Sequence, residues 1–198
     1  MHIKKGSLYL FIGPSGVGKT TLVKALIDSK KCSNLRVVPS YTTRPPRPGE
    51  KQGVDYHFIS QADFEQKLAA GFFIECSTAY KNAYGSRKSD ILQALSEGFD
   101  VLLVVDRTGA RSIKRELPET IIISIAPPDM AALEERLRLR TVKMSSEIAQ
   151  DIMFRLKKAA EEASEEDHEC LAQYIIVNDD LDETVEQLIC LFCRQKSA

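Results

Sequence analysis

The chain has 198 residues, 43% of them hydrophobic and 28% charged, so it can bury a core and needs no second independent domain. Its formal net charge of -1 leaves no overall basic field that would attract nucleic acid or anionic lipid. Its apolar runs are far shorter than the ~20 residues that span a bilayer. We therefore expect a cytoplasmic protein of one compact domain, with no nucleic-acid or membrane partner.

Residues 13–20 read Gly-Pro-Ser-Gly-Val-Gly-Lys-Thr and satisfy G-x-x-x-x-G-K-[ST], the pattern of a phosphate-binding loop. An apolar run precedes the loop, and the apolar spacing of residues 22–27 predicts a helix after it. Backbone N–H groups of such a loop converge on phosphate oxygens, and the helix adds the positive end of its dipole. Lys19 would add a mobile charge, and the Thr20 hydroxyl suits Mg²⁺.

Seven segments are predicted as strands, several of them separated by helical patterns: residues 7–12, 36–40, 55–59, 72–77, 101–106, 120–126 and 174–177. The runs 101–105 and 121–125 are almost continuously apolar, which is typical of strands covered on both faces in a parallel sheet. These features predict an α/β sandwich, in which phosphate sites lie beyond the carboxyl ends of the strands.

The five cysteines show no paired framework and leave one over by parity, which fits the reduced thiols of the cytoplasm. Cys190 and Cys193 form a C-x-x-C inside residues 182–194, whose apolar spacing predicts a closing amphipathic helix. Because no second pair or histidine lies nearby, we interpret them as ordinary thiols rather than a zinc or redox site.

Residues 38–89 have a different texture, with short alternating strands, many turn residues and a high density of Arg, Tyr and Thr. Within them, Arg44 and Arg47 lie three residues apart on a segment stiffened by three prolines. Two such guanidinium groups can be aimed at one dianionic phosphate at low entropic cost, and Tyr56 could donate a third bond. The alternative is a solvated basic loop, but the phosphate loop upstream favours a second phosphate site.

Five motifs follow one another along the chain: the phosphate loop, S-x-T-T-R-x-x-R-x-G-E with G-x-D-Y-x-F (40–58), F-[IL]-E with Y-G-[ST] (73–75 and 84–86), I-x-P-P (125–128) and V-N-D-D-L (177–181). In this order they resemble the motifs of the guanylate kinases, the nucleoside monophosphate kinases that move the γ-phosphoryl of ATP to GMP. The resemblance runs along nearly the whole chain. It implies a P-loop kinase three-layer sandwich with a central parallel sheet, an inserted small mixed α/β GMP-binding lobe and a helical lid. The single domain 1–198 would divide into a core (1–37, 91–128 and 160–198), a GMP-binding lobe (38–90) and a lid (129–159).

The resemblance also implies an activity, which is Mg-dependent transfer of the ATP γ-phosphoryl group to GMP, giving ADP and GDP, in purine nucleotide metabolism and GMP recycling. The small-molecule partners would be ATP and GMP or dGMP, with no obligate protein partner. Mg²⁺ would be held by Thr20. ATP would be bound by Gly13, Pro14, Ser15, Gly16, Val17, Gly18, Lys19, Thr20 and Thr21, and the catalytic residues would be Lys19, Arg44, Arg136, Arg140 and Arg155.

By the same resemblance, GMP would be bound by Ser40, Arg44, Arg47, Tyr56, Glu75, Tyr84, Ser86 and Asp106. The arginines and tyrosines would hold the phosphate, and Ser40, Glu75 and Ser86 would read the guanine. A carboxylate can accept from guanine N1–H and N2–H₂ together, whereas adenine offers no such paired donors, so a buried Glu75 would discriminate between the two. Asp106 lacks the second acidic residue that many relatives carry two positions earlier, because Val104 occupies that position. Its alternative role is to cap the helix that starts beside it.

The expected lid departs from the family's pattern. Residues 140–144 read Arg-Thr-Val-Lys-Met where relatives commonly have R-G and a short acidic segment, and additional residues intervene before Arg155. Arg138 is expected to face solvent.

Two other functions remain open at this point. A non-catalytic guanylate-kinase-like module that binds protein partners would not need the intact Lys19 and Thr20. A related P-loop kinase with a sugar phosphate acceptor would not need Ser40, Glu75, Tyr84 and Ser86.

Overall fold

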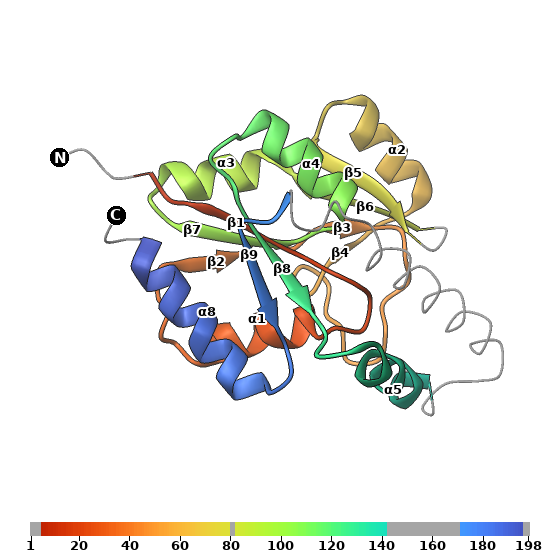
Figure 1. Ribbon diagram of the computed structural model, residues 1–198. Helices are drawn as coiled ribbons and strands as arrows, with labels where there is room; N and C mark the ends of the chain where they lie inside the picture. Colours follow the sequence, from red (N-terminus) through yellow and green to blue (C-terminus); the bar gives the residue numbers. More distant parts are fainter. Residues whose placement is uncertain (1–4, 80–81, 142–170, 196–198) are drawn as a thin grey trace. The chain divides into compact units, whose positions relative to one another are not determined.

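The computed structural model describes residues 5–79, 82–141 and 171–195 (Figure 1). The chain divides into two compact units, residues 1–10 with 34–121 and residues 11–33 with 122–198. The elements in chain order are β1 (Leu8–Ile12), α1 (Lys19–Asp28), β2 (Leu35–Val37), β3 (Tyr41–Thr42), β4 (His57–Phe58), α2 (Gln61–Ala69), β5 (Phe73–Ala79), β6 (Asn82–Arg87), α3 (Lys88–Ser96), β7 (Asp100–Val104), α4 (Arg107–Glu116), β8 (Ile121–Ala126), α5 (Met130–Thr141), β9 (Tyr174–Val177) and α8 (Leu181–Gln195).

The larger sheet has five strands in the order β2-β7-β1-β8-β9. β2 pairs with β7, and β8 pairs with β9, in both cases in parallel. Every residue of β1 is buried, and so are most residues of β7 and β8. The continuously apolar runs therefore form strands covered on both faces, and the expected α/β class with a parallel sheet is confirmed.

The first unit carries a second, mixed sheet in the order β4-β3-β6-β5. β3 pairs with β4 in parallel and with β6 antiparallel, and β5 pairs with β6 antiparallel. Aromatic rings pack around it, with Tyr41 stacked on His57 at 4.4 Å and Phe64 stacked on Phe73 at 4.7 Å between ring centroids. The expected small mixed lobe is therefore present as a sheet of its own.

Two of its strands, β3 and β6, were not expected from the sequence. The segment predicted as one strand over residues 36–40 is β2 over Leu35–Val37, and β3 follows it at Tyr41–Thr42. β6 carries few apolar residues and includes Gly85, so it lacks the alternation that indicates a strand. A Cβ at residue 85 would lie 2.9 Å from the Phe73 ring, so the glycine admits that ring.

Helix α4 packs on β5 within the first unit. Its N-cap is Asp106, whose Oδ1 accepts a hydrogen bond from the Gly109 amide at 2.8 Å. The start of α4 is thus fixed against the strand that carries Glu75.

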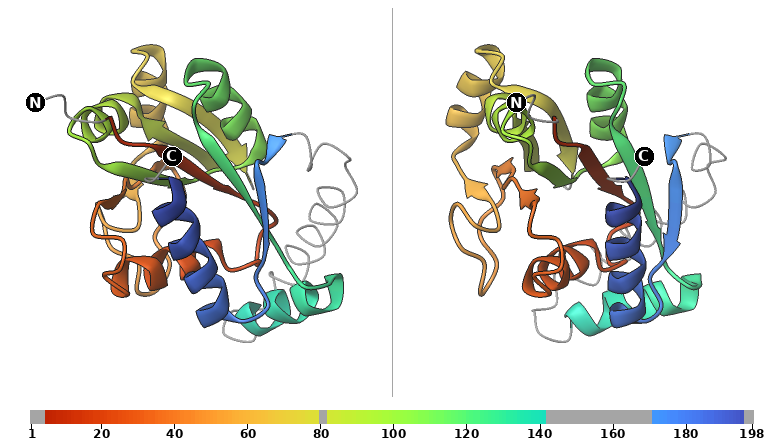
Figure 2. Two further views of the ribbon diagram at one scale, coloured as in Figure 1. Left: turned by 60° about the vertical axis from the view of Figure 1, so that its left-hand side comes forward. Right: turned by 90° about the vertical axis from the view of Figure 1, so that its left-hand side faces the viewer.

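In the second unit, α1 packs against α8 (Figure 2). Leu22, Val23 and Leu26 of α1 are buried, as are Val185, Leu188, Ile189 and Phe192 of α8. The helix expected over residues 182–194 is confirmed as α8. None of the described helices has the length and apolarity needed to cross a membrane.

Candidate functional site

The predicted phosphate loop joins β1 to α1 in the second unit. Gly18 is the N-cap of α1 with φ 102°, a left-handed conformation that an L side chain rarely adopts. A Cβ there would also lie 2.4 Å from Asn178 Nδ2. That side-chain amide donates to the Val17 carbonyl at 2.6 Å, and the Asn178 main-chain amide donates to Ala126 at 2.8 Å. The loop backbone is therefore held in place from the end of β9.

The Lys19 ammonium lies over this loop, where it donates to the carbonyls of Gly13 (2.5 Å) and Pro14 (2.9 Å). Thr20 and Thr21 are exposed in the first turn of α1, which contains no acidic residue. A helix N-terminus with a mobile cation and no acidic side chain in its first turn is suited to bind an anion.

Arg136 of α5 is anchored in the same unit. Its guanidinium donates from Nη1 to the Asn178 carbonyl at 2.8 Å and from Nη2 to the Asp179 carbonyl at 3.1 Å. Arg138 is exposed and pairs with Glu134 one turn earlier, as expected of a solvent-facing residue.

The other two predicted lid arginines cannot be placed. Arg140 belongs to α5, but its side chain lies outside the described part of the chain, and so does Arg155. A catalytic role for the three arginines stays a prediction.

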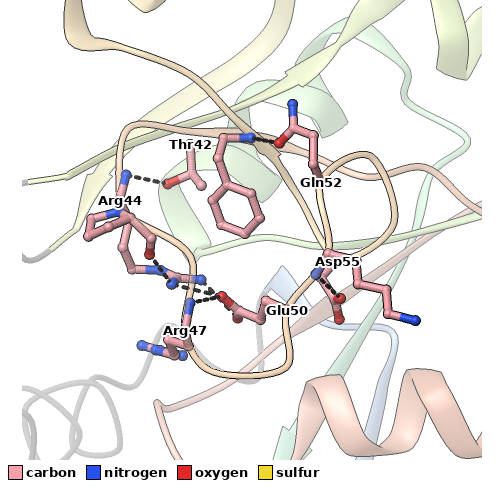
Figure 3. Close-up of polar contacts among 9 residues, drawn as sticks. Thr42, Arg44, Arg47, Glu50, Gln52 and Asp55 are labelled. Carbon is pink, nitrogen blue, oxygen red and sulfur yellow. Dashed lines mark hydrogen bonds and ion pairs between the residues drawn. The ribbon is translucent and has the colours of Figure 1, made fainter.

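In the first unit, Arg44 is held in a network of polar contacts (Figure 3). Nη1 and Nη2 donate to the two carboxylate oxygens of Glu50 at 2.9 and 3.0 Å, and Nη1 also donates to the Pro45 carbonyl at 2.7 Å. The guanidinium carbon lies 5.4 Å from the centroid of the Tyr56 ring and 5.7 Å from that of Phe58. Arg44 is thus fixed by an ion pair on one side and aromatic rings on another.

The two tyrosines predicted to bind phosphate lie beside Arg44. Their rings meet edge to face with 6.1 Å between centroids, and Tyr84 also interacts with the Arg44 guanidinium. Burial raises the pKa of Tyr56, so its hydroxyl keeps its proton and remains a donor. The structure therefore brings Arg44, Tyr56 and Tyr84 together, while the side chain of Arg47, three residues after Arg44, is exposed.

Three of the predicted guanine-reading residues form a hydrogen-bonded chain. The Ser86 hydroxyl donates to Glu75 Oε1 at 2.7 Å, and the Ser40 and Ser86 hydroxyl oxygens lie 3.1 Å apart. Ser86 is fully buried, and Glu75 is only 6% exposed. Burial raises the pKa of Glu75 to about 7, with the Ser86 hydrogen bond opposing the rise and the charge of Asp106 adding to it.

Asp106 lies close enough to affect Glu75, but one of its oxygens caps α4. The helix-cap role considered from the sequence is confirmed, and the substrate role stays a prediction. Gly109, in the first turn of that helix, admits the Glu75 carboxylate, because a Cβ at 109 would lie 2.6 Å from Oε2.

Sequence reasoning gave no role to two residues that the structure brings into the site. Glu50 binds Arg44, and its signal was the Pro48-Gly49 pair that turns the chain back before it. Asn178 binds the phosphate loop across 161 residues of sequence, and nothing local to it indicated that contact.

Comparison with known proteins places this geometry in a family. The model of the family described as "Guanylate kinase" matches residues 5–194. The guanylate kinase of Thiobacillus denitrificans is 44% identical over 186 residues, which cover 94% of this chain and 85% of the relative. That of Idiomarina loihiensis is 40% identical over 193 residues, which cover 96% and 89%. The crystal structure of guanylate kinase from Anaplasma phagocytophilum is similar with a TM-score of 0.78 and 28% identity, covering 98% of this chain and 88% of that one.

Replacing Glu75 by glutamine should change how stability depends on pH. The folded chain holds the Glu75 proton up to about pH 7 instead of 4.5, so wild-type stability should fall as pH rises through that window. The free energy of unfolding of Glu75→Gln should not show this fall. Above pH 7 it should therefore exceed that of wild type by about 3 kcal/mol at most, and near pH 4.5 the excess should be absent. Denaturant unfolding at pH 5 and pH 8 measures the difference. The control is Glu97→Gln, an exposed carboxylate on the end of α3, and parallel pH profiles for wild type and Glu75→Gln would contradict the expectation.

Proposed function

The chain belongs to the guanylate kinase family, and we propose how its own residues share the ATP-dependent phosphorylation of GMP that the family performs. One observation carries the choice of acceptor. Glu75 is a buried carboxylate bound to the Ser86 hydroxyl, with its pKa raised by burial. Keeping such a carboxylate ionised in a buried site costs free energy until a ligand supplies hydrogen-bond donors to it.

Glu75 accepts the N1–H and N2–H₂ groups of guanine, which a carboxylate can do side by side. The Ser86 hydroxyl has one proton, which it gives to Glu75 in the free chain, so it turns to donate to the guanine O6 once the guanine N–H groups take its place on Glu75. The Ser40 hydroxyl, 3.1 Å away, can then donate to the Ser86 oxygen. Asp106 shares the binding of GMP from the start of α4. Adenine and pyrimidines lack this donor pair, so they would leave the carboxylate buried without compensation.

The GMP phosphate binds to Arg44, Arg47, Tyr56 and Tyr84. The close contacts among Arg44, Tyr56 and Tyr84 support this, since a guanidinium and two hydroxyls on one patch suit an oxyanion. The exposed Arg47 side chain supplies a second positive charge.

ATP binds through the amides of residues 13–18, with Lys19 leaving its contacts with the Gly13 and Pro14 carbonyls for the terminal phosphates. Thr21 lines the same helix start. The exposed Thr20 hydroxyl, in a first turn without acidic residues, fits a role as a hard-oxygen ligand of Mg²⁺. The ion would neutralise charge between the β- and γ-phosphates.

The acceptor needs no general base, because its nucleophile is an anionic phosphate oxygen. The residues act by alignment and by charge, which is the main source of catalysis in phosphoryl transfer. Lys19 and Arg44 contact the two phosphate groups that react. Arg136, Arg140 and Arg155 stabilise charge on the transferred group.

The finer assignments belong to the same proposal. They are a core of residues 1–37, 91–128 and 160–198, a GMP-binding lobe of 38–90 and a lid of 129–159, with dGMP as a further acceptor and no obligate protein partner. We place the protein in the cytoplasm, which the reduced thiols of Cys76, Cys190 and Cys193 support.

Acceptor specificity tests the proposal. In a coupled assay, wild type should phosphorylate GMP and leave AMP, CMP and UMP almost unused. Glu75→Gln should lower kcat/KM for GMP by about 10- to 100-fold, because a charged acceptor of guanine donors is lost. Equal rates with another acceptor, or an unchanged Glu75→Gln enzyme, would overturn the assignment, and Glu97→Gln again serves as control.

Binding of GMP should release a proton from Glu75. Guanine donors bind the ionised carboxylate, and its pKa of about 7 leaves a sizeable fraction protonated at neutral pH. Calorimetry at pH 7 in buffers of different ionisation enthalpy should give about half a proton released by wild type and less by Glu75→Gln, where only the phosphate's own ionisation remains. Identical proton release by the two proteins would exclude Glu75 as the guanine acceptor.

Lys19→Ala tests the phosphate loop. The ammonium neutralises charge that develops on the transferred group, so its loss should lower kcat with GMP and ATP by about 100-fold or more. Lys24→Ala, an exposed lysine further along α1, is the matched control. A Lys19→Ala enzyme as active as wild type would contradict the role and favour a module that does not use its phosphate loop.

A further inference from the structure

Residues 47–50, Arg-Pro-Gly-Glu, form a tight turn. The Glu50 amide donates to the Arg47 carbonyl at 3.0 Å, and Gly49 has φ +85°. Proline at the second position and a glycine of positive φ at the third are the pattern of a type II turn. The local sequence therefore dictates that the chain returns on itself before Glu50.

The turn brings the Glu50 carboxylate back to the residues that precede it (Figure 3). Oε2 accepts from the Arg47 amide at 2.7 Å and from Arg44 Nη1 at 2.9 Å, and Oε1 accepts from Arg44 Nη2 at 3.0 Å. The Arg44 and Glu50 side chains are only 10% and 17% exposed. Burial alone would raise the pKa of Glu50, but the hydrogen bonds from Arg44 and the Arg47 amide outweigh it and leave this pKa lowered.

This arrangement determines which edge of the Arg44 guanidinium can bind a ligand. Nη1 has two N–H groups, and these go to Glu50 and to the Pro45 carbonyl. Nη2 gives one of its two to Glu50. Nε–H and the second N–H of Nη2 share the other edge of the guanidinium and match two oxygens of one oxyanion. Tyr84, which also interacts with this guanidinium, is proposed to bind the same phosphate.

We propose that Glu50 is a positioning residue for the acceptor phosphate, holding Arg44 so that this second edge is presented before GMP arrives. The inference rests on the proposed function, in which Arg44 binds that phosphate. Glu50 itself does not touch the reacting atoms. Its contribution is to remove the rotamer freedom that a long arginine side chain would otherwise lose on binding.

A second effect of Glu50 has the opposite sign. A carboxylate near a dianionic phosphate repels it, so removing Glu50 would tighten binding if repulsion were the larger effect. The bidentate pair with Arg44 already neutralises the Glu50 charge, which reduces that repulsion. Positioning should therefore dominate, and removing Glu50 should weaken GMP binding.

The experiment compares Glu50→Gln, Glu50→Ala and Glu50→Asp in the full chain. Calorimetry with GMP and with guanosine, together with steady-state kinetics, should show Kd and KM for GMP raised about 10- to 30-fold in Glu50→Gln, with guanosine Kd and ATP KM within about twofold of wild type. Glu50→Asp keeps the charge, so its Kd and KM for GMP should lie between those of wild type and Glu50→Gln. The isosteric Glu50→Gln carries the test whether or not Glu50→Ala folds.

Two controls separate positioning from general loosening of the loop. Asp55 accepts from the Lys51 amide at 2.9 Å in the same loop, so Asp55→Asn perturbs that segment without removing the Glu50–Arg44 pair, and its GMP Kd should stay within about threefold of wild type. In an Arg44→Ala background, adding Glu50→Gln should cause no further loss of GMP binding, because Glu50 acts through Arg44 and, once Arg44 is removed, only its repulsion of the phosphate remains.

Unchanged or tighter GMP binding by Glu50→Gln would overturn the inference. Equal losses for GMP and guanosine, an equal loss in Asp55→Asn, or an additive loss in the Arg44→Ala background would overturn it too. None of these results affects turnover of GMP by wild type, so they would leave the proposed function standing. Failure of the proposed function is distinguished by a wild-type enzyme that neither binds nor phosphorylates GMP, and that result would remove the inference with it.

Discussion

In the proposed function, recognition of the acceptor nucleotide depends on a carboxylate buried beside a hydroxyl. Glu75 accepts a hydrogen bond from Ser86, and burial raises its pKa to about 7. The free chain therefore carries a group that is poorly satisfied in its charged form, and a ligand with two adjacent N–H donors relieves it. In the proposed function, selectivity for guanine follows from the free-energy cost of leaving this carboxylate unpaired, which is larger than the gain from an added contact.

Glu50 and Glu75 lie in the same unit and have opposite environments. Glu50 is bound by a guanidinium and an amide and has a lowered pKa, whereas Glu75 has a raised one. The first carboxylate is satisfied within the protein and can fix a neighbour. In the proposed function, Glu75 is completed by the substrate. Environment, more than residue type, assigns the two roles.

The phosphate loop could be predicted from the sequence because its glycines and the Lys-Thr ending are local requirements of one backbone path. The buried strands could be predicted because a continuous apolar run has few alternatives. β6 could not, since a polar segment with Gly85 becomes a strand only by pairing with β3 and β5. Arg44 was found from its local chemistry, and Glu75 and Ser86 were found from resemblance, but Glu50, which pairs with Arg44, was given no role. The sequence does not distinguish an ion pair such as Arg44–Glu50 from two charged side chains that are each solvated. The Asn178 contact joins residues that are 161 positions apart.

Phosphoryl transfer between two nucleotides needs alignment more than it needs proton transfer, and the polar contacts of this chain reflect that. Glu50 fixes a guanidinium, Asn178 fixes the Val17 carbonyl of the phosphate loop, and Arg136 binds the carbonyls of residues 178 and 179. Asn178 therefore receives Arg136 on its main chain while its side chain holds the loop. A change at Asn178 would remove the hydrogen bond to the Val17 carbonyl, although Asn178 does not belong to the loop itself.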